Sequence, residues 1–204
     1  MNLRYVLMDV DGVIVPGRGS RFAHHLAAQY GLTDTATKSF FRFFRGPFQQ
    51  CLVGMADLRV ELPPYIAQWE WPGNVDDFLA EWFRCEHIVD SQVLAVMDRL
   101  RQEGVGVYLA TNQEAYRTRY LQEHMGLMDH VDGVFASCMV GHLKPLPEYF
   151  ESVLESLAAA PSSVLLWDDS ERIVSEARSL GLRGELFEDT TAFVEKMSGY
   201  FPQV

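Results

Sequence analysis

Residues 5–13 read YVLMDVDGV, and this stretch decides the fold of the 204-residue chain. Its first four residues are apolar without alternation, a pattern typical of a short strand that is buried on both faces. Asp9, Asp11 and Gly12 follow within the next four positions. In a parallel sheet, ligands bind outside the carboxyl ends of the strands. The stretch therefore predicts a buried parallel strand that ends in an acidic turn at a binding edge.

Four further apolar runs predict four more strands, at residues 105–110, 134–136, 164–167 and 184–187. Helical patterns lie between them. Ser91–Glu103 has an apolar face, a capping residue in Ser91 and a stop signal in Gly104, and Ser170–Leu180 repeats the design and stops at Gly181. The alternation of strand and helix predicts an α/β fold, with a Rossmann-like parallel sheet flanked by helices.

Residues 15–89 interrupt this alternation, because they contain no convincing strand pattern. Helical periodicity predicts helices at Ser20–Tyr30, Thr35–Arg45 and Val75–Arg84. We therefore expect a discontinuous α/β core of residues 1–14 and 90–204, with residues 15–89 as an inserted α-helical cap domain. The second of these helices carries four phenylalanines, which we interpret as core packing of the cap, with a substrate platform as the alternative: Phe40, Phe41, Phe43 and Phe44.

The composition excludes several classes of function. A formal net charge of -11 argues against a nucleic-acid surface, which needs clustered Lys and Arg. No apolar run approaches the roughly 20 residues of a membrane-spanning helix, and the chain starts with a strand pattern rather than a signal peptide. We therefore expect a cytoplasmic protein without a membrane partner. Cys51, Cys85 and Cys138 lack the paired spacing of a disulfide framework or a zinc site.

Reactive side chains follow four of the predicted strands. A structural role alone would predict caps and turns at these places, not a set of carboxylates with a hydroxyl and a lysine. Since the carboxyl ends of parallel strands share one edge, we expect these side chains to lie together. The candidates are Asp9 and Asp11 after the first strand, Thr111 and Asn112 after the second, Lys144 beyond the third, and Asp168 and Asp169 after the fourth.

This set of residue types suits phosphoryl transfer. Carboxylates from adjacent strands repel one another unless a hard cation such as Mg²⁺ lies between them. With that cation, the Lys144 ammonium and the Thr111 hydroxyl would form a cage for a phosphate group. Asp9 is then placed to attack phosphorus and form an aspartyl phosphate, while Asp11 can protonate the leaving alkoxide and later activate water.

Four short motifs, DVDGV, LATN, KPLPEYF and LLWDDS, occur in this order across nearly the whole chain. In order and spacing the chain resembles the haloacid dehalogenase-like hydrolases, in the subfamily with a small helical cap between the first and second motifs. The resemblance implies Asp9 as nucleophile and magnesium ligand, and Asp11 as acid/base that also binds the metal through its backbone carbonyl. It further implies Thr111, Asn112 and Lys144 on the phosphate and Asp169 on the metal, with Asp168 bound to the metal directly or through water.

These expectations leave several functions open. We expect a magnesium-dependent phosphohydrolase of a small phosphorylated metabolite, with a sugar phosphate or a nucleotide as candidates. A phosphomutase of the β-phosphoglucomutase type is the alternative, and haloacid dehalogenase chemistry or a non-catalytic binding role is less favoured. In the cap, Arg42 and Arg45 are the candidates for contacts with the substrate, because arginine offers a fork of donors. Whether the chain is a monomer or a dimer is left open.

Overall fold

The computed structural model describes residues 3–17, 21–30 and 33–202. Its core is a five-stranded sheet in the order β3-β2-β1-β4-β5, with every neighbouring pair parallel. The α/β class and the parallel sheet predicted from the sequence are confirmed. All five strands lie within one residue of their predicted bounds: β1 Tyr5–Met8, β2 Gly106–Thr111, β3 Gly133–Ala136, β4 Val164–Asp168 and β5 Arg183–Leu186.

The register of the sheet aligns the carboxyl ends of its three inner strands. Met8, the last residue of β1, pairs with Leu109 of β2 and Trp167 of β4. The Asp9 amide continues this ladder by donating a hydrogen bond to the Trp167 carbonyl at 2.9 Å. Side chains that follow β1, β2 and β4 therefore emerge at one edge, as the sequence predicted.

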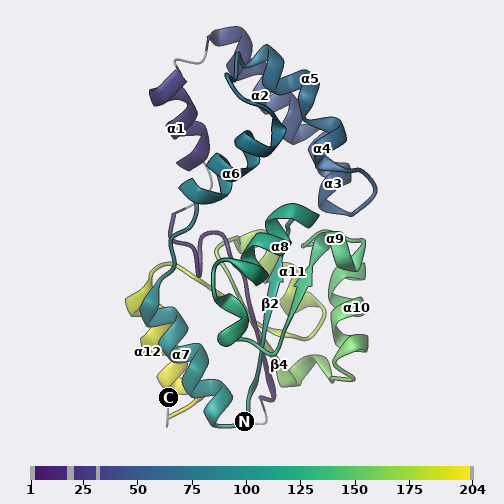
Figure 1. Cartoon of the computed structure of the whole chain (residues 1–204). Coiled ribbons are helices and arrows are strands. Elements are labelled where there is room, and N and C mark those ends of the chain that lie inside the picture. Colours follow the sequence, from purple (N-terminus) through teal and green to yellow (C-terminus); the bar gives the residue numbers. More distant parts are fainter. Residues whose placement is uncertain (1–2, 18–20, 31–32, 203–204) are drawn as a thin grey trace.

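Helices cover both faces of the sheet (Figure 1). One face packs against α7 (Ser91–Gln102), α8 (Ala115–Glu123) and α12 (Thr190–Tyr200), and the other against α10 (Pro147–Ser156) and α11 (Glu171–Ser179). Short elements connect them: η1 Leu127–Asp129, α9 Ser137–Val140 and η2 Pro161–Ser163.

The predicted N-cap residue of α7 is wrong by one position. Asp90, not Ser91, is the N-cap, and its Oδ1 accepts hydrogen bonds from the backbone amides of Gln92 and Val93. An aspartate and a serine are both good N-caps, so two adjacent candidates cannot be separated by residue type alone.

Between β1 and α7 the described residues form six helices, which we call the cap and which lie over the carboxyl edge of the sheet in Figure 1. The cap has an aromatic core of its own, centred on Phe43, Phe78 and Leu62, which are fully buried. Ser20 and Gly31, the predicted start and stop of the first helix, lie outside the described residues. The six are α1 Arg21–Tyr30, α2 Asp34–Arg45, α3 Pro47–Leu52, α4 Leu58–Glu61, α5 Pro63–Gln68 and α6 Val75–Cys85.

Several contacts join the cap to the core. Where the chain enters and leaves the cap, the Asp90 amide donates a hydrogen bond to the Ile14 carbonyl at 2.8 Å. On the far side, the Ser137 hydroxyl donates to the Leu52 carbonyl at 2.6 Å, and the Tyr116 hydroxyl donates to the Asp57 carboxylate at 2.9 Å. The cap is thus held at its connection and at a second point beyond it.

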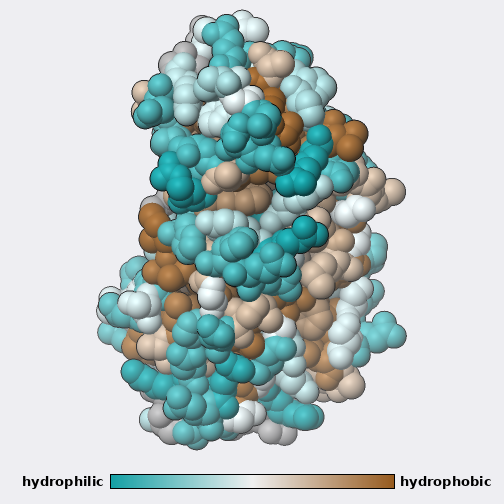
Figure 2. Space-filling view, viewed as in Figure 1, coloured by the Kyte–Doolittle hydropathy of each residue, from teal (hydrophilic) through white to brown (hydrophobic). Residues whose placement is uncertain are grey.

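The surface in Figure 2 is largely hydrophilic over the cap, with apolar side chains exposed where the chain passes between cap and core. The longest helices, α2 and α7, have 12 residues each. No helix of the described ranges combines the length and the apolar content that crossing a bilayer requires.

Candidate active site

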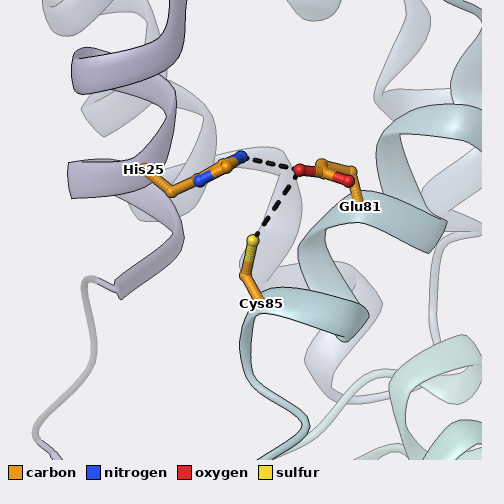
Figure 3. Close-up of side chains that lie close together, drawn as sticks. All are labelled: His25, Glu81 and Cys85. Atoms are coloured by element: carbon orange, nitrogen blue, oxygen red, sulfur yellow. Dashed lines mark hydrogen bonds and ion pairs between the residues drawn. The ribbon is translucent and has the colours of Figure 1, made fainter.

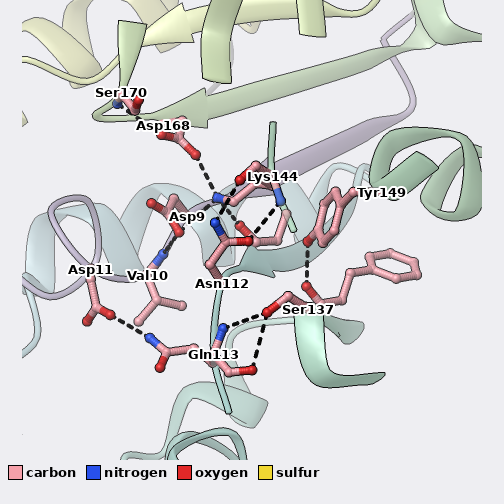
Figure 4. Close-up of polar contacts among 12 residues, drawn as sticks. Asp9, Val10, Asp11, Asn112, Gln113, Ser137, Lys144, Tyr149, Asp168 and Ser170 are labelled. Carbon is pink, nitrogen blue, oxygen red and sulfur yellow. Dashed lines mark hydrogen bonds and ion pairs between the residues drawn. The ribbon is translucent and has the colours of Figure 1, made fainter. Parts of the chain in front are cut away.

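The first part of the site is a buried ion triad of Asp9, Lys144 and Asp168 (Figure 4). The Lys144 ammonium lies 3.0 Å from Asp9 Oδ1 and 2.6 Å from Asp168 Oδ2, and it also donates to the Ala110 carbonyl at 2.6 Å. Burial lowers the pKa of Lys144 and the two carboxylates raise it, with a net upward shift. The lysine is therefore held as a cation directly beneath the Asp9 carboxylate.

Asp9 is the member of this triad that follows β1. Burial raises the pKa of its carboxyl to about 7, while Lys144 acts in the opposite direction. Its Oδ1 also accepts a hydrogen bond from the Val10 amide at 2.8 Å, which fixes the carboxylate relative to the turn that follows β1. A divalent cation beside Asp9 would add to the effect of Lys144 and favour the ionised, nucleophilic form.

The two aspartates after β4 have different surroundings. Asp168 is fully buried, and its oxygens bind Lys144 and the Ser170 amide. Asp169 is partly exposed and lies against the turn after β1. A Cβ at Gly12, where φ is +92°, would approach Asp169 Oδ2 to 2.4 Å, so this position has no room for a side chain.

Oxygen ligands for a cation are present at this edge. Asp9, Asp168 and Asp169 each offer a carboxylate oxygen, and the three oxygens lie within 4.8 Å of one another. Converging carboxylates are the donors that Mg²⁺ and Ca²⁺ prefer. The donor set therefore fits the predicted magnesium ion.

Thr111 ends β2 and Asn112 follows it directly, but their side chains have different surroundings. Thr111 is buried at the last position of β2. The Asn112 amide is occupied by the Lys144 backbone: its Nδ2 donates to the Lys144 carbonyl and its Oδ1 accepts from the Lys144 amide, both at 2.9 Å. This pair of hydrogen bonds positions Lys144, a role that the sequence did not suggest for Asn112.

Asp11 is held by a residue that sequence reasoning missed. The Gln113 side-chain amide donates a hydrogen bond to Asp11 Oδ2, and the Gln113 backbone amide donates to Ser137 Oγ at 3.0 Å (Figure 4). Gln113 precedes α8, which begins at Ala115 and is capped by Glu114. Its place just after the second strand was the available signal, because strand ends point to the site.

A cavity of about 600 Å³ extends from this edge into the cap. Asp11, Asn112 and Gln113 line its core end, and side chains of α1, α2, α3 and α6 line most of the rest, together with Val15, Gly17 and Glu86. Arg42 and Arg45 are not among its lining residues; both are exposed, and the Arg45 guanidinium lies 5.7 Å from the centre of the Phe41 ring. The structure thus brings the core candidates together and leaves the two cap arginines outside the cavity.

A separate group of metal-ligand residue types lies within the cap (Figure 3). His25 Nε2 is 2.6 Å from Glu81 Oε1, and Cys85 Sγ is 4.0 Å from the same oxygen. Arg84 binds both Glu81 oxygens, at 2.7 and 2.8 Å, and this hydrogen bonding holds the pKa of Glu81 below its usual value. Because the carboxylate is already paired, we describe the group as an ion-pair network that ties α1 to α6.

Comparison with known proteins identifies the family and the fold. The sequence model of the haloacid dehalogenase-like hydrolases matches residues 3–181. A HAD family enzyme of Bacteroides thetaiotaomicron, solved in complex with magnesium and inorganic phosphate, has the same fold with a TM-score of 0.79. It is 20% identical in sequence, and the match covers 94% of this chain and 98% of that one.

Two curated relatives are similar to the chain in sequence. A sesquiterpene phosphatase of Aspergillus oryzae is 31% identical over 103 residues, which are 50% of this chain and 53% of that protein. The bifunctional epoxide hydrolase 2 of Rattus norvegicus is 29% identical over 223 residues, which are 100% of this chain and 40% of that protein. The chain thus spans about half or less of the length of these relatives.

Proposed function

This chain belongs to the haloacid dehalogenase-like hydrolases, and from that premise we propose that it is a magnesium-dependent phosphatase that cleaves a phosphate monoester through an aspartyl phosphate. The observation that carries the proposal is the difference in position between two aspartates, Asp9 and Asp11. Asp9 is held by Lys144 at the sheet edge, whereas Asp11 lines the cavity where a leaving group would sit. The Aspergillus relative is named a sesquiterpene phosphatase, and this name supports the phosphatase reaction proposed here.

The reaction would proceed in two steps. In the first, an Asp9 carboxylate oxygen forms a bond to phosphorus while the bond from phosphorus to the ester oxygen breaks, and Asp11 gives its proton to that oxygen. In the second, Asp11 takes a proton from water, whose oxygen attacks phosphorus and releases Asp9 and inorganic phosphate. Gln113 holds the Asp11 carboxyl on the side of the cavity in both steps.

The remaining core residues stabilise charge. Lys144 favours the ionised form of Asp9 and adds a fixed positive charge beside the reacting group. Asp9 and Asp169 would hold Mg²⁺ with the Asp11 backbone carbonyl, and Asp168, whose oxygens bind Lys144 and Ser170, would act mainly by anchoring the lysine. When bound, the ion supplies neutralisation of the charge on the phosphate oxygens.

Two alternative reactions differ in how many of these features they use. Haloacid dehalogenase chemistry needs the first aspartate but leaves Asp11, its Gln113 partner and the cation ligands without a task. A phosphomutase shares the first step and differs in excluding water from the second. The paired position of Asp11 at the cavity favours hydrolysis over dehalogenation.

The test uses the variants Asp9→Asn and Asp11→Asn with an activated aryl phosphate. Its leaving group needs little protonation, so Asp11→Asn should still be phosphorylated and then stall, because an amide is a poor general base. Intact-mass measurement after rapid quenching should show one added phosphoryl group on Asp11→Asn and none on Asp9→Asn. Wild-type turnover should disappear in excess chelator and return with Mg²⁺. Full activity of Asp11→Asn on an alkyl phosphate would overturn the proposed mechanism.

A further inference from the structure

The wall of the cavity that faces Asp11 is aromatic. Among the side chains that line it, six are aromatic and come from α1, α2, α3 and α6: Phe22, Phe40, Phe41, Phe44, Phe48 and Trp82. The volume of about 600 Å³ lies within the usual range of small-molecule sites, roughly 300–1,000 Å³. An apolar site of this size, with a reactive carboxyl at one end, can hold a substrate that is larger than its phosphate group.

These rings form one continuous surface, not a set of isolated contacts. Phe44 is its centre, with ring centroids 4.6 Å from Phe40, 4.8 Å from Phe48 and 5.5 Å from Trp82. Trp82 stacks on Phe22 at 5.7 Å, which extends the surface from α2 to α1. Phe40 and Trp82 are mostly buried in the cap core, so the aromatic surface is packed against that core. Of the four phenylalanines of α2, Phe43 lies in the cap core and Phe41 lines the cavity, while Phe40 and Phe44 do both.

Few polar groups face the cavity from the cap helices. Beyond the core end, the polar side chains that line the cavity are His24 and Thr37, from α1 and α2, and Glu86, which directly follows α6. A sugar phosphate carries several hydroxyls, and each hydroxyl that is buried without a partner costs about 1–3 kcal/mol. A hydrocarbon group gains roughly 25 cal/mol for each Å² of apolar surface that it removes from water. The wall thus favours an apolar alcohol over a polyhydroxylated one.

From this wall we infer that the cavity binds the hydrocarbon part of the substrate, so that the enzyme prefers phosphate monoesters of apolar alcohols to sugar phosphates. The inference rests on the proposed phosphatase function, because it takes the phosphate to lie at Asp9. With the ester oxygen beside Asp11, the alcohol points away from the sheet edge and along the aromatic surface of α2 and α6. This substrate class differs from the sugar phosphate that the sequence left as a candidate.

The first test compares phosphate release from methyl, butyl, hexyl and octyl phosphate, below their micelle concentrations, with release from glucose 6-phosphate. Transfer of one methylene from water implies a rise in kcat/KM of about two- to fourfold per carbon until the cavity is full. Octyl phosphate should therefore exceed both methyl phosphate and glucose 6-phosphate by at least about a hundredfold. Magnesium-dependent hydrolysis without a chain-length effect would overturn the inference and leave the proposed function standing.

A matched pair of variants locates the effect. Phe41→Asp places a charge on the cavity wall, and Val60→Asp makes the same kind of change on α4, away from the cavity. Both residues are exposed, 50% and 70%, so neither change empties the cap core. Phe41→Asp should lower the octyl-to-methyl ratio of kcat/KM by about tenfold or more, and Val60→Asp should leave it unchanged. Equal ratios in the two variants would contradict the inference.

A binding measurement separates this inference from the proposed chemistry. Octylphosphonate and methylphosphonate cannot be hydrolysed at a phosphate ester, and their dissociation constants are measured by calorimetry in the presence of Mg²⁺. The octyl compound should bind at least about a hundredfold more tightly to the wild type, and this advantage should shrink in Phe41→Asp. If no ester were hydrolysed, the proposed function would fail while this result still decided the cavity's preference. Equal affinities of the two phosphonates would overturn the inference.

Discussion

The side-chain amide of Gln113 donates a hydrogen bond to Asp11 Oδ2 across the carboxyl edge of the sheet. The two residues follow different strands, β1 and β2, and both line the cavity. The position of the proposed acid/base is therefore set by a residue from the neighbouring strand as well as by its own turn. Gln113 is in turn fixed by the hydrogen bond from its backbone amide to Ser137.

Gln113→Met should impair catalysis without loss of the fold, because methionine matches the length of glutamine but cannot donate to Asp11. With Asp11 less well placed, we expect kcat for an alkyl phosphate to fall by about tenfold or more, in the range typical of acid/base positioning. Hydrolysis of an activated aryl phosphate should fall less in its first step, which is read from the burst of released phenol. An equal loss in both steps and on both esters would assign Gln113 to binding instead.

Lys144→Met should affect stability and activity together. Removal of the ammonium leaves Asp168 buried without its cationic partner, and breaking a buried pair costs about 3–5 kcal/mol. Without the ammonium, the carboxylates of Asp9 and Asp168 repel each other, and a bound cation would offset part of this repulsion. The drop in melting temperature relative to wild type should therefore be larger in chelator than in excess Mg²⁺. Lys196→Met, at an exposed ion pair with Glu185, is the control and should lower the melting temperature little in either condition.

Glu114 should make stability depend on pH. Burial raises the pKa of its carboxyl to about 7 from a usual value of 4.5. Between these values the folded protein holds a proton that the unfolded chain has released. The stabilising contribution is thus fully present below pH 4.5 and is lost as the pH rises through about 7.

Glu114→Gln removes this titration. The free energy of unfolding of the variant, measured with urea and compared with wild type at each pH, should rise relative to wild type from pH 4.5 to pH 7. The comparison cancels the titration of other groups, which both proteins share. A constant difference across this range would show that Glu114 does not titrate there.

Tyr116→Phe should loosen the cap on the side away from its connection. The change removes the hydrogen bond from the Tyr116 hydroxyl to Asp57 and keeps the ring that packs beside Arg59. A partly exposed hydrogen bond contributes about 1 kcal/mol, so opening of this contact should increase several-fold. Hydrogen–deuterium exchange should accelerate in residues 54–58. Tyr200→Phe, which loses a comparable bond to Glu185 within the core, should leave exchange in this segment unchanged.

Much of the fold follows from local pattern. The bounds of β1 are those predicted, because an apolar run that ends in two aspartates marks both the strand and its end. The short helices α3, α4 and α5 have four to six residues each and were not predicted. Helices of that length are too short to show a helical period, and tertiary packing decides whether they form.

Part of the candidate site could likewise be predicted from the sequence, and part could not. Asp9, Lys144 and Asp168 could be grouped from the sequence, because the parallel sheet brings the residues after its strands to one edge. Gln113 and Arg42 could not be assigned, for different reasons. The role of Gln113 depends on a loop conformation, and that of Arg42 on which face of α2 turns toward the core.

The hydrogen bond between the Asp90 amide and the Ile14 carbonyl brings the two ends of residues 15–89 side by side. In terms of chain closure, that whole segment is equivalent to one surface loop inserted between β1 and α7. Doubling the length of such a loop adds only about 0.6 kcal/mol to its closure. One segment can therefore be exchanged for another of different length and shape while the proposed catalytic residues, which lie outside it, are kept. The proposed selectivity for the alcohol would then change, in evolution or by engineering, without a change in the reaction.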